Sequence, residues 1–445
     1  MFRKILIANR GEIALRVIRA CKELGIKTLA VYSKADEHSL HVKMADESVC
    51  IGPPQPKLSY LNIASIISAA DVSGVDAIHP GYGFLSENQN FAKVCEQCNI
   101  TFIGPKPEHI AAMGDKVAAR NAAEKAGVPL LPGTGLLRTV EEAITEAERI
   151  GYPVMLKATA GGGGRGIQVV YHKAQLVNAF ERVKTEATAA FGNGLSYLEK
   201  YCEHPRHVEI QVACDSHGNR VHLGERDCTV QRRHQKLIEE SPSPVVDEEL
   251  RKKMGEAALR LCAEVNYLNV GTVEFLVDEN KNFYFMEMNT RIQVEHPVTE
   301  MITGIDLVKL QIHIAAGGKL PFEQKDIEFR GHAIECRINA EDPVRLFPSP
   351  GVITAYHPPG GFGVRVDSFA YQQYKVPPFY DSMIGKLICW AATREEAIEK
   401  MANALDEYVI AGIQTNTSFQ RKIILHEKFR SLKYDTHFLE QFMTQ

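Results

Sequence analysis

The stretch that decides the fold is Phe283-Tyr284-Phe285-Met286-Glu287-Met288-Asn289-Thr290-Arg291-Ile292-Gln293-Val294-Glu295. From position 287 the odd positions carry Glu, Asn, Arg, Gln and Glu, whereas the even positions carry mostly Met, Ile and Val. Successive side chains of an extended chain point to opposite faces, so the pattern predicts a strand with one apolar face and one face of charges and amides. A strand face that is only solvated has the same alternation.

The preceding residues predict a hairpin. The apolar segment Val273-Glu274-Phe275-Leu276-Val277 is followed by a polar turn over 278–282. With the turn centred between Asn280 and Lys281, Glu274 faces Glu287 directly. Directly opposed like charges destabilise a sheet, so a cation between them is the simplest explanation. Two carboxylates with the oxygen of Asn289 suit Mg²⁺. A register slip of one residue would separate the carboxylates.

Length and composition bound the class of protein. The chain has 445 residues, 24% charged and 45% hydrophobic, with a net charge of -4. These values predict a soluble protein of two to four domains, without a broad nucleic-acid surface or a membrane span. Ten cysteines are scattered, several among apolar residues, as at Cys50, Cys262 and Cys389. They predict reduced core thiols and a cytoplasmic location.

The first hundred residues alternate strand and helix. Strands are expected at 4–8, 28–32, 77–79 and 101–104, with a helix from Gly11, which predicts a parallel sheet with crossover helices. A helical stretch over 108–126 and a linker near 130–135 follow. A helix over 139–150 and strands at 154–158 and 167–171 come next.

A glycine run, 161–166, lies between those last two strands and contains Arg165. A dinucleotide fingerprint would be followed by a helix, and the Gly-Lys-Ser/Thr of a P-loop is missing. The arrangement instead predicts a flap whose amides close over phosphates, and the alternative is a mobile hairpin tip. The loop 79–88, with two glycines around Tyr82, is expected to face a ligand, and the alternative is a plain turn.

These motifs together resemble one family. The resemblance is carried by segments spread from residue 7 to residue 386, namely 7–14, 79–88, 113–116, 161–166, 205–211, 225–236, 287–300, 335–343 and 380–386. The chain resembles biotin carboxylases of the ATP-grasp superfamily, and in particular the free-standing biotin carboxylase subunit of bacterial acetyl-CoA carboxylase. The resemblance implies an α/β N-terminal parallel-sheet domain (1–113) plus ATP-grasp α+β domains, a lid (114–203) and a catalytic core (204–330), followed by a C-terminal domain (331–445).

The resemblance also assigns site residues. It implies an ATP site at Lys116, Lys157, Gly163, Gly164, Glu199, Lys200, Tyr201, Cys202, His207, Gln231, His234 and Leu276. It implies metal ligands at Glu274, Glu287 and Asn289, a bicarbonate pocket at Lys236, Arg291, Gln293, Val294 and Glu295, and a biotin site at Tyr82 and Arg337. The catalytic residues would be Glu295, Arg291, Arg337 and Lys236. Cys202 and Ile167 stand where the family often has Leu and Met, which puts nucleotide affinity in doubt.

The residue types fit the implied chemistry. Glu295 would remove the bicarbonate proton, Lys236 and Arg291 would hold an oxyanion, and Arg337 would stabilise an enolate on biotin. A structural salt bridge from Arg337 to Glu335 or Glu341 is the alternative. The resemblance implies ATP and Mg²⁺ as cofactors, with Mn²⁺ as a substitute.

Partners are implied by what the chain lacks. No biotinylation motif occurs in it. The resemblance therefore implies a separate biotin carboxyl carrier protein, carboxyltransferase subunits and a homodimer. The alternatives are a two-subunit pyruvate or other acyl-CoA carboxylase, an ATP-grasp ligase that joins a carboxylate to an amine, and a non-catalytic ATP-binding protein.

Overall fold

The N-terminal part is a five-stranded parallel sheet. The computed structural model describes residues 1–158, 166–191, 194–233 and 235–443. The strand order is β3-β2-β1-β4-β5, and every pairing is parallel, which confirms the predicted sheet. The strands are β1 (Lys4–Ile7), β2 (Lys27–Ser33), β3 (Glu47–Gly52), β4 (Ala77–His79) and β5 (Thr101–Phe102). The helices between them are α1 (Gly11–Glu23), α2 (Leu40–Met44), α3 (Ile63–Ser73) and α4 (Gln89–Gln97), with 3-10 turns at Lys34–Asp36 and Pro56–Leu58.

The helical stretch expected over 108–126 is confirmed, and it is interrupted once. Two helices occupy this stretch, α5 (Pro107–Gly114) and α6 (Lys116–Lys125). Asp115 separates them with an extended backbone, and its Oδ1 accepts from the amide of Ala118 at 2.8 Å. An aspartate at this position satisfies a free amide of the helix that it begins, so it favours a new N-terminus over continuation.

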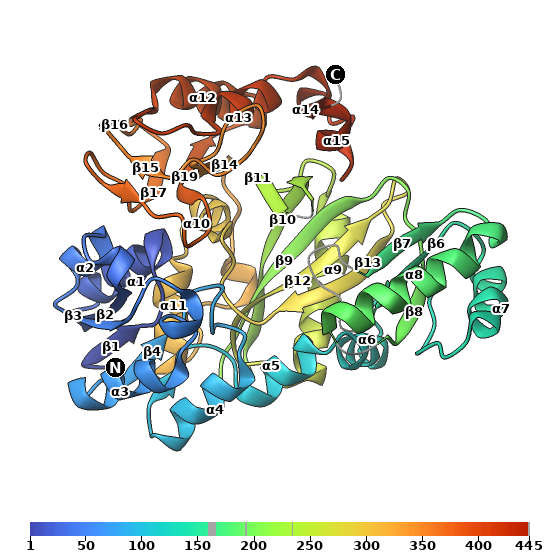
Figure 1. Cartoon of the computed structure of the whole chain (residues 1–445), viewed down its shortest axis with the longest axis horizontal. Coiled ribbons are helices and arrows are strands. Elements are labelled where there is room, and N and C mark those ends of the chain that lie inside the picture. Colours follow the sequence, from blue (N-terminus) through green and yellow to red (C-terminus); the bar gives the residue numbers. More distant parts are fainter. Residues whose placement is uncertain (159–165, 192–193, 234, 444–445) are drawn as a thin grey trace.

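The next part is a small lid at the right of Figure 1. Its three-stranded sheet has the order β7-β6-β8, with helices α7 and α8 packed on it. The elements are α7 (Val140–Ile150), β6 (Val154–Ala158), β7 (Ile167–Val170), α8 (Lys173–Phe191) and β8 (Ser196–Lys200). Helix α7 and strands β6 and β7 lie where the sequence predicted, whereas α8 and β8 were not predicted. Of the glycine run, only Gly166 lies within the described residues, with φ +71°.

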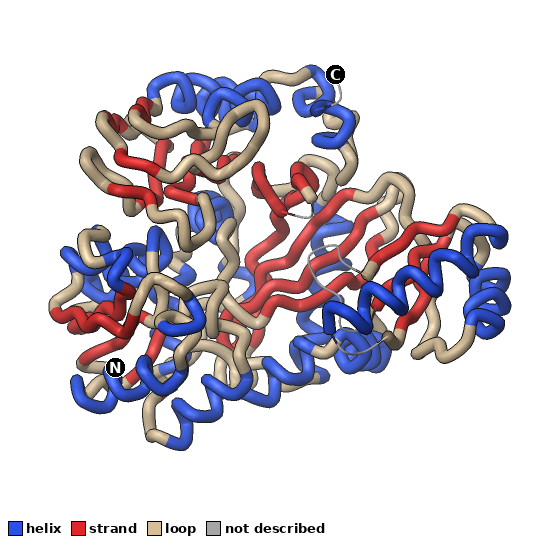
Figure 2. Tube along the Cα trace, in the orientation of Figure 1, coloured by secondary structure: helices blue, strands red, loops and turns tan. Residues whose placement is uncertain are grey.

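The largest element is an eight-stranded antiparallel sheet in the middle of the molecule (Figure 2). Its order is β13-β12-β9-β10-β11-β14-β19-β17. The strands are β9 (Arg206–Cys214), β10 (Arg220–Arg232), β11 (Gln235–Ser241), β12 (Asn269–Val277), β13 (Phe283–Asn289), β14 (His332–Asn339), β17 (Val364–Ser368) and β19 (Met383–Ala391). The sheet continues across residue 330, so the predicted division there, like the other domain limits, stays a prediction.

Helices and short strands complete the molecule. Helices α9 (Glu248–Glu264), α10 (His296–Thr303) and α11 (Leu307–Ala315) pack against the large sheet. The C-terminal part adds β15 (Gly351–Val352), β16 (Ala355–His357), β18 (Lys375–Val376), β20 (Val409–Ala411), α12 (Arg394–Glu407), α13 (Thr417–Ile424), α14 (Glu427–Arg430) and α15 (Phe438–Met443), and a 3-10 turn lies at Gln324–Asp326. Among the described helices, none combines the length and apolarity needed to cross a membrane.

The cores follow this division. Separate clusters of buried side chains lie under the parallel sheet, within the lid and beneath the C-terminal strands. All ten cysteines are free, and Cys262 and Cys389 are buried as predicted. The expectation for Cys50 is wrong, because it lies exposed on the edge strand β3. The C-terminal segment returns to the start of β9, where the amide of Thr436 donates to the carbonyl of Pro205 at 3.1 Å.

Candidate active site

A cavity of about 1250 Å³ lies where the four parts meet. Its wall includes most of the residues that the sequence singled out, namely Tyr82, Lys116, Lys157, Glu199, Lys200, Tyr201, Cys202, His207, Gln231, Lys236, Glu274, Leu276, Glu287, Asn289, Arg291, Gln293, Val294 and Arg337. Glu295 is fully buried directly behind this wall. Gly163, Gly164, Arg165 and His234 lie outside the described residues.

The predicted acidic pair is confirmed. Glu274 on β12 and Glu287 on β13 are direct Cα partners across the hairpin. Burial alone would raise the pKa of Glu274, but Lys236 and His207 outweigh it and hold the pKa low. Withdrawal from bulk water and then the charge of Glu274 raise the pKa of Glu287. A carboxylate kept ionised next to one that resists ionisation is an arrangement that a divalent cation would relieve.

In this structure Asn289 turns its amide nitrogen, and not its oxygen, toward Glu274. Its Nδ2 donates to Glu274 Oε1 at 2.8 Å, and its Oδ1 accepts from Arg291 at 2.8 Å. The amide oxygen and nitrogen are nearly isosteric, so a flip of the amide would turn the oxygen toward the carboxylates. Glu274 Oε1 accepts from Lys236, Asn289 and Gln293, and Oε2 is bonded by His207. A cation at the pair would therefore displace some of these donors, and Asn289 would offer its oxygen after this flip.

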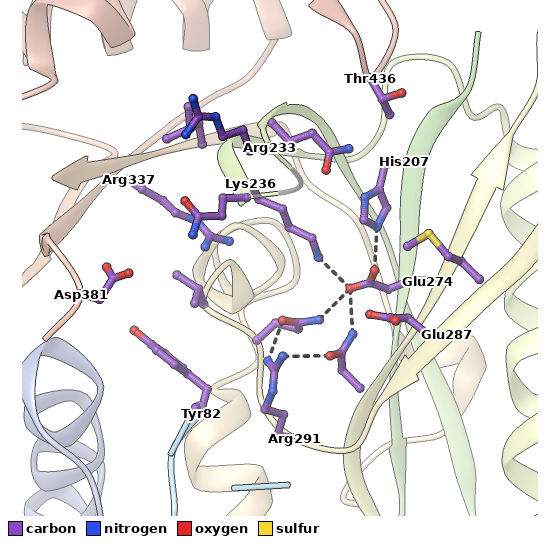
Figure 3. Close-up of a pocket in the computed structure, with 18 of the residues that line it drawn as sticks. Tyr82, His207, Arg233, Lys236, Glu274, Glu287, Arg291, Arg337, Asp381 and Thr436 are labelled. Carbon is purple, nitrogen blue, oxygen red and sulfur yellow. Dashed lines mark hydrogen bonds and ion pairs between the residues drawn. The ribbon is translucent and has the colours of Figure 1, made fainter. Parts of the chain in front are cut away.

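Lys236 contacts three carboxylates of a charged network, and Figure 3 shows its contact with Glu274. Its Nζ lies 2.5 Å from Glu209, 2.8 Å from Glu274 and 2.7 Å from Glu295. Burial lowers the pKa of Lys236, but the three carboxylates outweigh burial and raise it well above the usual value. The ammonium therefore keeps its charge at the bottom of the cavity.

The prediction that the chain stays extended as far as Glu295 is wrong beyond Asn289. The strand ends there, 290–295 form a loop, and Glu295 is the N-cap residue of α10. The polar side chains nevertheless converge. Arg291 donates to Glu87, Gln293 and Asn289, each at 2.8 Å, and Gln293 donates to Glu274 at 3.0 Å. These contacts, most of them drawn in Figure 3, hold a guanidinium and an amide at the cavity wall.

Arg337 on β14 lies beside the base predicted at position 295. Its guanidinium is 2.6 Å from Glu239 and 3.0 Å from Glu295. The alternative salt bridges to Glu335 or Glu341 are not among its hydrogen bonds. Burial opposes ionisation of Glu295, but Lys236 and then Arg337 hold its pKa well below the usual range. Each oxygen of Glu295 accepts a hydrogen bond from a cationic side chain, Oε1 from Lys236 and Oε2 from Arg337.

The far end of the cavity is lined by the lid. Lys157 on β6 contacts Glu199 on β8, and Arg120 donates to the same carboxylate at 2.6 Å. Burial lowers the pKa of Lys116. Tyr201 shares a hydrogen bond of 3.0 Å with His437, so the C-terminal segment forms part of this wall. Lys200 points its Nζ to the carbonyls of Gly151 and Tyr152.

Sequence reasoning missed several buried charges around the site. They are Glu12, Glu209, Arg226, Glu239, Glu335 and Lys386. Three of them, Glu209, Glu335 and Lys386, stand alone between uncharged neighbours in a strand, as Glu209 does between Val208 and Ile210. A single charge in an otherwise buried strand is the signal that would have found them, because such charges are rarely buried without a partner.

Comparison with known proteins identifies the class of protein to which this fold and cavity belong. Three family profiles match: "Biotin carboxylase, N-terminal domain" over 1–110, "Carbamoyl-phosphate synthase L chain, ATP binding domain" over 115–323, and "Biotin carboxylase C-terminal domain" over 335–441. Fold and site define an ATP-grasp ligase. The chain is 58% identical over 445 residues to "Biotin carboxylase 1" of Bacillus subtilis, with 99% of each chain covered. The chain belongs to the biotin carboxylase family.

Solved structures agree with this. A biotin carboxylase complex with ATP from Campylobacter jejuni superposes with a TM-score of 0.96 at 52% identity, covering 99% of both chains. The biotin carboxylase domain of a 2-oxoglutarate carboxylase from Hydrogenobacter thermophilus superposes with a TM-score of 0.94 at 52% identity, covering 99% of this chain and 98% of that one. That protein is a dimer in complex with MgADP, ADP and bicarbonate.

Proposed function

We propose that this chain carboxylates biotin, using ATP and bicarbonate, by way of carboxyphosphate. The observation that carries the proposal is the meeting of three sets of groups in one cavity: the acidic pair Glu274 and Glu287, the anion-binding loop with Arg291, and Arg337 beside Glu295. A cation site, an oxyanion site and a buried carboxylate base are what phosphorylation of bicarbonate requires.

In the first stage the triphosphate lies between the lid and the large sheet. Lys116 and Lys157 contact its phosphates. Glu274, Glu287 and the flipped Asn289 would hold Mg²⁺, which would supply positive charge next to the transferred group. The adenine lies against Glu199, Lys200, Tyr201, Cys202 and Leu276, with His207, Gln231, His234, Gly163 and Gly164 completing the site. Cys202 and Ile167 line that end of the cavity, where their size sets nucleotide affinity.

Bicarbonate lies against Lys236, Arg291, Gln293 and the amide of Val294. Glu295 removes its proton while its oxygen attacks the terminal phosphorus, so one O–P bond forms and the bond to ADP breaks. In the free protein Lys236 and Arg337 make Glu295 a weak base. When the substrates engage those two cations, the carboxylate loses part of their stabilisation and becomes a stronger base.

Biotin occupies the part of the cavity between Tyr82 and Arg337. Carboxyphosphate breaks down to CO2 and phosphate, and the phosphate takes the proton from the ureido nitrogen, which then attacks CO2. Arg337 stabilises the negative charge that develops on the ureido oxygen. Closure of the glycine flap keeps water from the labile intermediate.

Several parts of the proposal concern partners. The biotin arrives on a separate biotin carboxyl carrier protein, and carboxyltransferase subunits consume the carboxybiotin. The chain acts as a homodimer in the cytoplasm. Its domains are the four segments 1–113, 114–203, 204–330 and 331–445. The reaction is proposed as the first half-reaction of acetyl-CoA carboxylase in fatty acid synthesis, and the name of the Bacillus subtilis relative, "Biotin carboxylase 1", is consistent with it. The Hydrogenobacter thermophilus domain, taken from a 2-oxoglutarate carboxylase, supports a second candidate, the same half-reaction serving a different acceptor.

The test is ATP hydrolysis by the purified chain with Mg²⁺. The proposal predicts turnover that needs bicarbonate, is stimulated by free biotin, and is lost in Arg337→Ala. Hydrolysis that is indifferent to both bicarbonate and biotin would contradict the proposal and favour a carboxylate–amine ligase. Acceptor choice is tested separately, by adding carboxyltransferases of known specificity.

A further inference from the structure

A buried ion pair lies next to the site without belonging to any of its assigned residue sets. Glu12 is the second residue of α1, and Lys386 lies in the middle of β19. Lys386 Nζ is 3.3 Å from Glu12 Oε1, and the two side chains are 0% and 2% exposed. Both residues stand in segments that carry the family resemblance, yet neither has a role in the chemistry described above.

The pair reaches the cavity wall at both ends. The hydroxyl of Tyr82 donates to the same Oε1 of Glu12. At the other end, Lys386 Nζ donates to the carbonyl of Val294 at 2.7 Å. Tyr82 and Val294 both line the cavity. A continuous chain of contacts therefore runs from Tyr82 through Glu12 and Lys386 to Val294.

The strands fix where this chain of contacts lies. Lys386 is the direct Cα partner of Arg337 across β14 and β19, so it keeps a constant position relative to the guanidinium. Glu12 belongs to the first helix of the parallel sheet, and Val294 to the loop that follows β13. Three parts of the molecule that are far apart in sequence are thus tied together at one point.

The contact with Val294 fixes one peptide of the proposed anion-binding loop, residues 290–295. The carbonyl of Gln293 accepts from His296 Nδ1 at 2.7 Å, and the next carbonyl accepts from Lys386. Both peptide bonds are trans. In a trans peptide the N–H points away from the C=O, so the amides of Val294 and Glu295 are turned away from these two donors.

A buried ion pair is weak support for a role in stability, because desolvation offsets much of its attraction. Two apolar residues of similar volume would fill the same space at lower cost. Glu12 also accepts from the Tyr82 hydroxyl, and Lys386 also donates to the Val294 carbonyl. Because both bonds go to the cavity wall, the charges need an explanation other than stability.

We infer that Glu12 and Lys386 are positioning residues of the carboxylation reaction, which hold the Tyr82 hydroxyl at a fixed place relative to the Val294 peptide. The inference rests on the proposed function, since Tyr82 would lie against biotin and Val294 against bicarbonate. The pair joins the two subsites, so the acceptor nitrogen and the carbon source are aligned together. The nucleotide end of the cavity does not depend on it.

Steady-state kinetics on the full chain with free biotin test this inference. Lys386→Met removes the charge at similar length, and Glu12→Gln keeps an acceptor for Tyr82 but removes the charge. We expect either change to lower biotin-dependent kcat/KM at least tenfold and to raise the KM for biotin. The dissociation constant for ADP should stay within twofold. Lys375→Met, an exposed lysine on β18, is the matched control and should leave all three quantities unchanged.

A double-mutant cycle separates positioning from folding. If Tyr82→Phe acts through the pair, its effect on the KM for biotin should shrink to less than twofold in the Glu12→Gln background. Parallel loss of ADP affinity and biotin turnover would show a structural role and overturn the inference, as would fully multiplicative effects in the cycle. Should Lys386→Met not fold, the Glu12→Gln cycle decides alone.

The failure of the two proposals would look different. If free biotin does not change the turnover of the unsubstituted chain, the proposed function is overturned. A chain that responds to biotin, with Glu12→Gln and Lys386→Met variants that respond equally well, overturns the positioning role and leaves the proposed function intact.

Discussion

Glu274 and Glu287 are direct Cα partners on adjacent strands, and both carboxylates line the same cavity. Like charges in this position destabilise the hairpin that carries them. Lys236 and His207 offset the charge of Glu274, whereas burial and then the charge of Glu274 raise the pKa of Glu287. From this remaining repulsion we propose that the pair holds a divalent cation.

The first prediction concerns this pair. Glu287→Gln removes one anionic ligand with little change of shape, so the gain in ADP affinity on adding Mg²⁺ should fall by about tenfold or more, corresponding to at least about 1.4 kcal/mol. Calorimetric titration of ADP with and without Mg²⁺ measures it. Glu279→Gln, in the exposed turn of the same hairpin, should behave as the unchanged chain. Equal Mg²⁺ dependence in both variants would remove Glu287 from the metal site.

The second prediction concerns the base. Glu295→Gln keeps the side-chain shape beside Lys236 and Arg337 but cannot accept a proton. Bicarbonate-dependent ATP hydrolysis should fall by about 10²–10⁴-fold, the usual contribution of a general base. The dissociation constant for ADP should not change. A variant that retains more than about a tenth of the activity would contradict the role of Glu295.

The third prediction is a pH dependence of stability. Burial, and then the charge of Glu295 against the opposing effect of Arg337, raise the pKa of Glu239 to about 7. The folded chain thus holds a proton that the unfolded chain releases at about pH 4.3. This contribution to stability is complete below that pH and is lost as the pH rises through 7.

The measurement compares Glu239→Gln with the unchanged chain between pH 5 and pH 8. The loss of thermal stability over this range should be smaller in Glu239→Gln, which has no proton to lose. Glu264→Gln, at the exposed end of α9, should keep the original slope. Identical slopes in all three proteins would show that Glu239 is ionised throughout.

The fourth prediction concerns the junction of the N-terminal and C-terminal parts. Arg10 makes two bonds of 2.7 Å to Asp36, both side chains are buried, and its guanidinium lies 4.1 Å from the ring centroid of Tyr380. Asp36→Asn leaves this cation without its counter-charge and should cost about 3–5 kcal/mol.

Thermal unfolding of the full chain measures this cost as a drop of several degrees in Tm. The matched control is Asp406→Asn, which breaks the solvent-exposed pair with Arg421 and should change Tm little. Equal effects of the two substitutions would show that burial does not decide the strength of the Arg10–Asp36 pair.

The hairpin shows how far sequence reasoning reached. The predicted turn centre lay between Asn280 and Lys281, whereas Val277 pairs with Phe283, which centres the turn on Asn280. That shift alone would have put Glu274 opposite Met286. A register shift between Glu274 and Phe275 restores the pairing with Glu287. The prediction was right because two local irregularities cancel, and neither has a signal in the sequence pattern.

Long-range contacts were the least predictable part of the site. Alternation continues to Glu295 although the strand ends at Asn289, because the loop is held by side chains from other segments, such as Glu87 and Lys386. Glu239 and Glu335 are Cα partners across β11 and β14, yet they lie nearly a hundred residues apart. Periodicity identifies faces of single elements, and it carries no information about which elements meet.

Carboxylation of biotin by this chain is tested by following the carbon atom. The chain would be incubated with ATP, Mg²⁺, free biotin and isotope-labelled bicarbonate, and carboxybiotin and ADP would be quantified together. We expect labelled carboxybiotin that appears only when ATP is present and is lost in Arg337→Ala. Formation of ADP without any transfer of label to biotin would contradict this expectation.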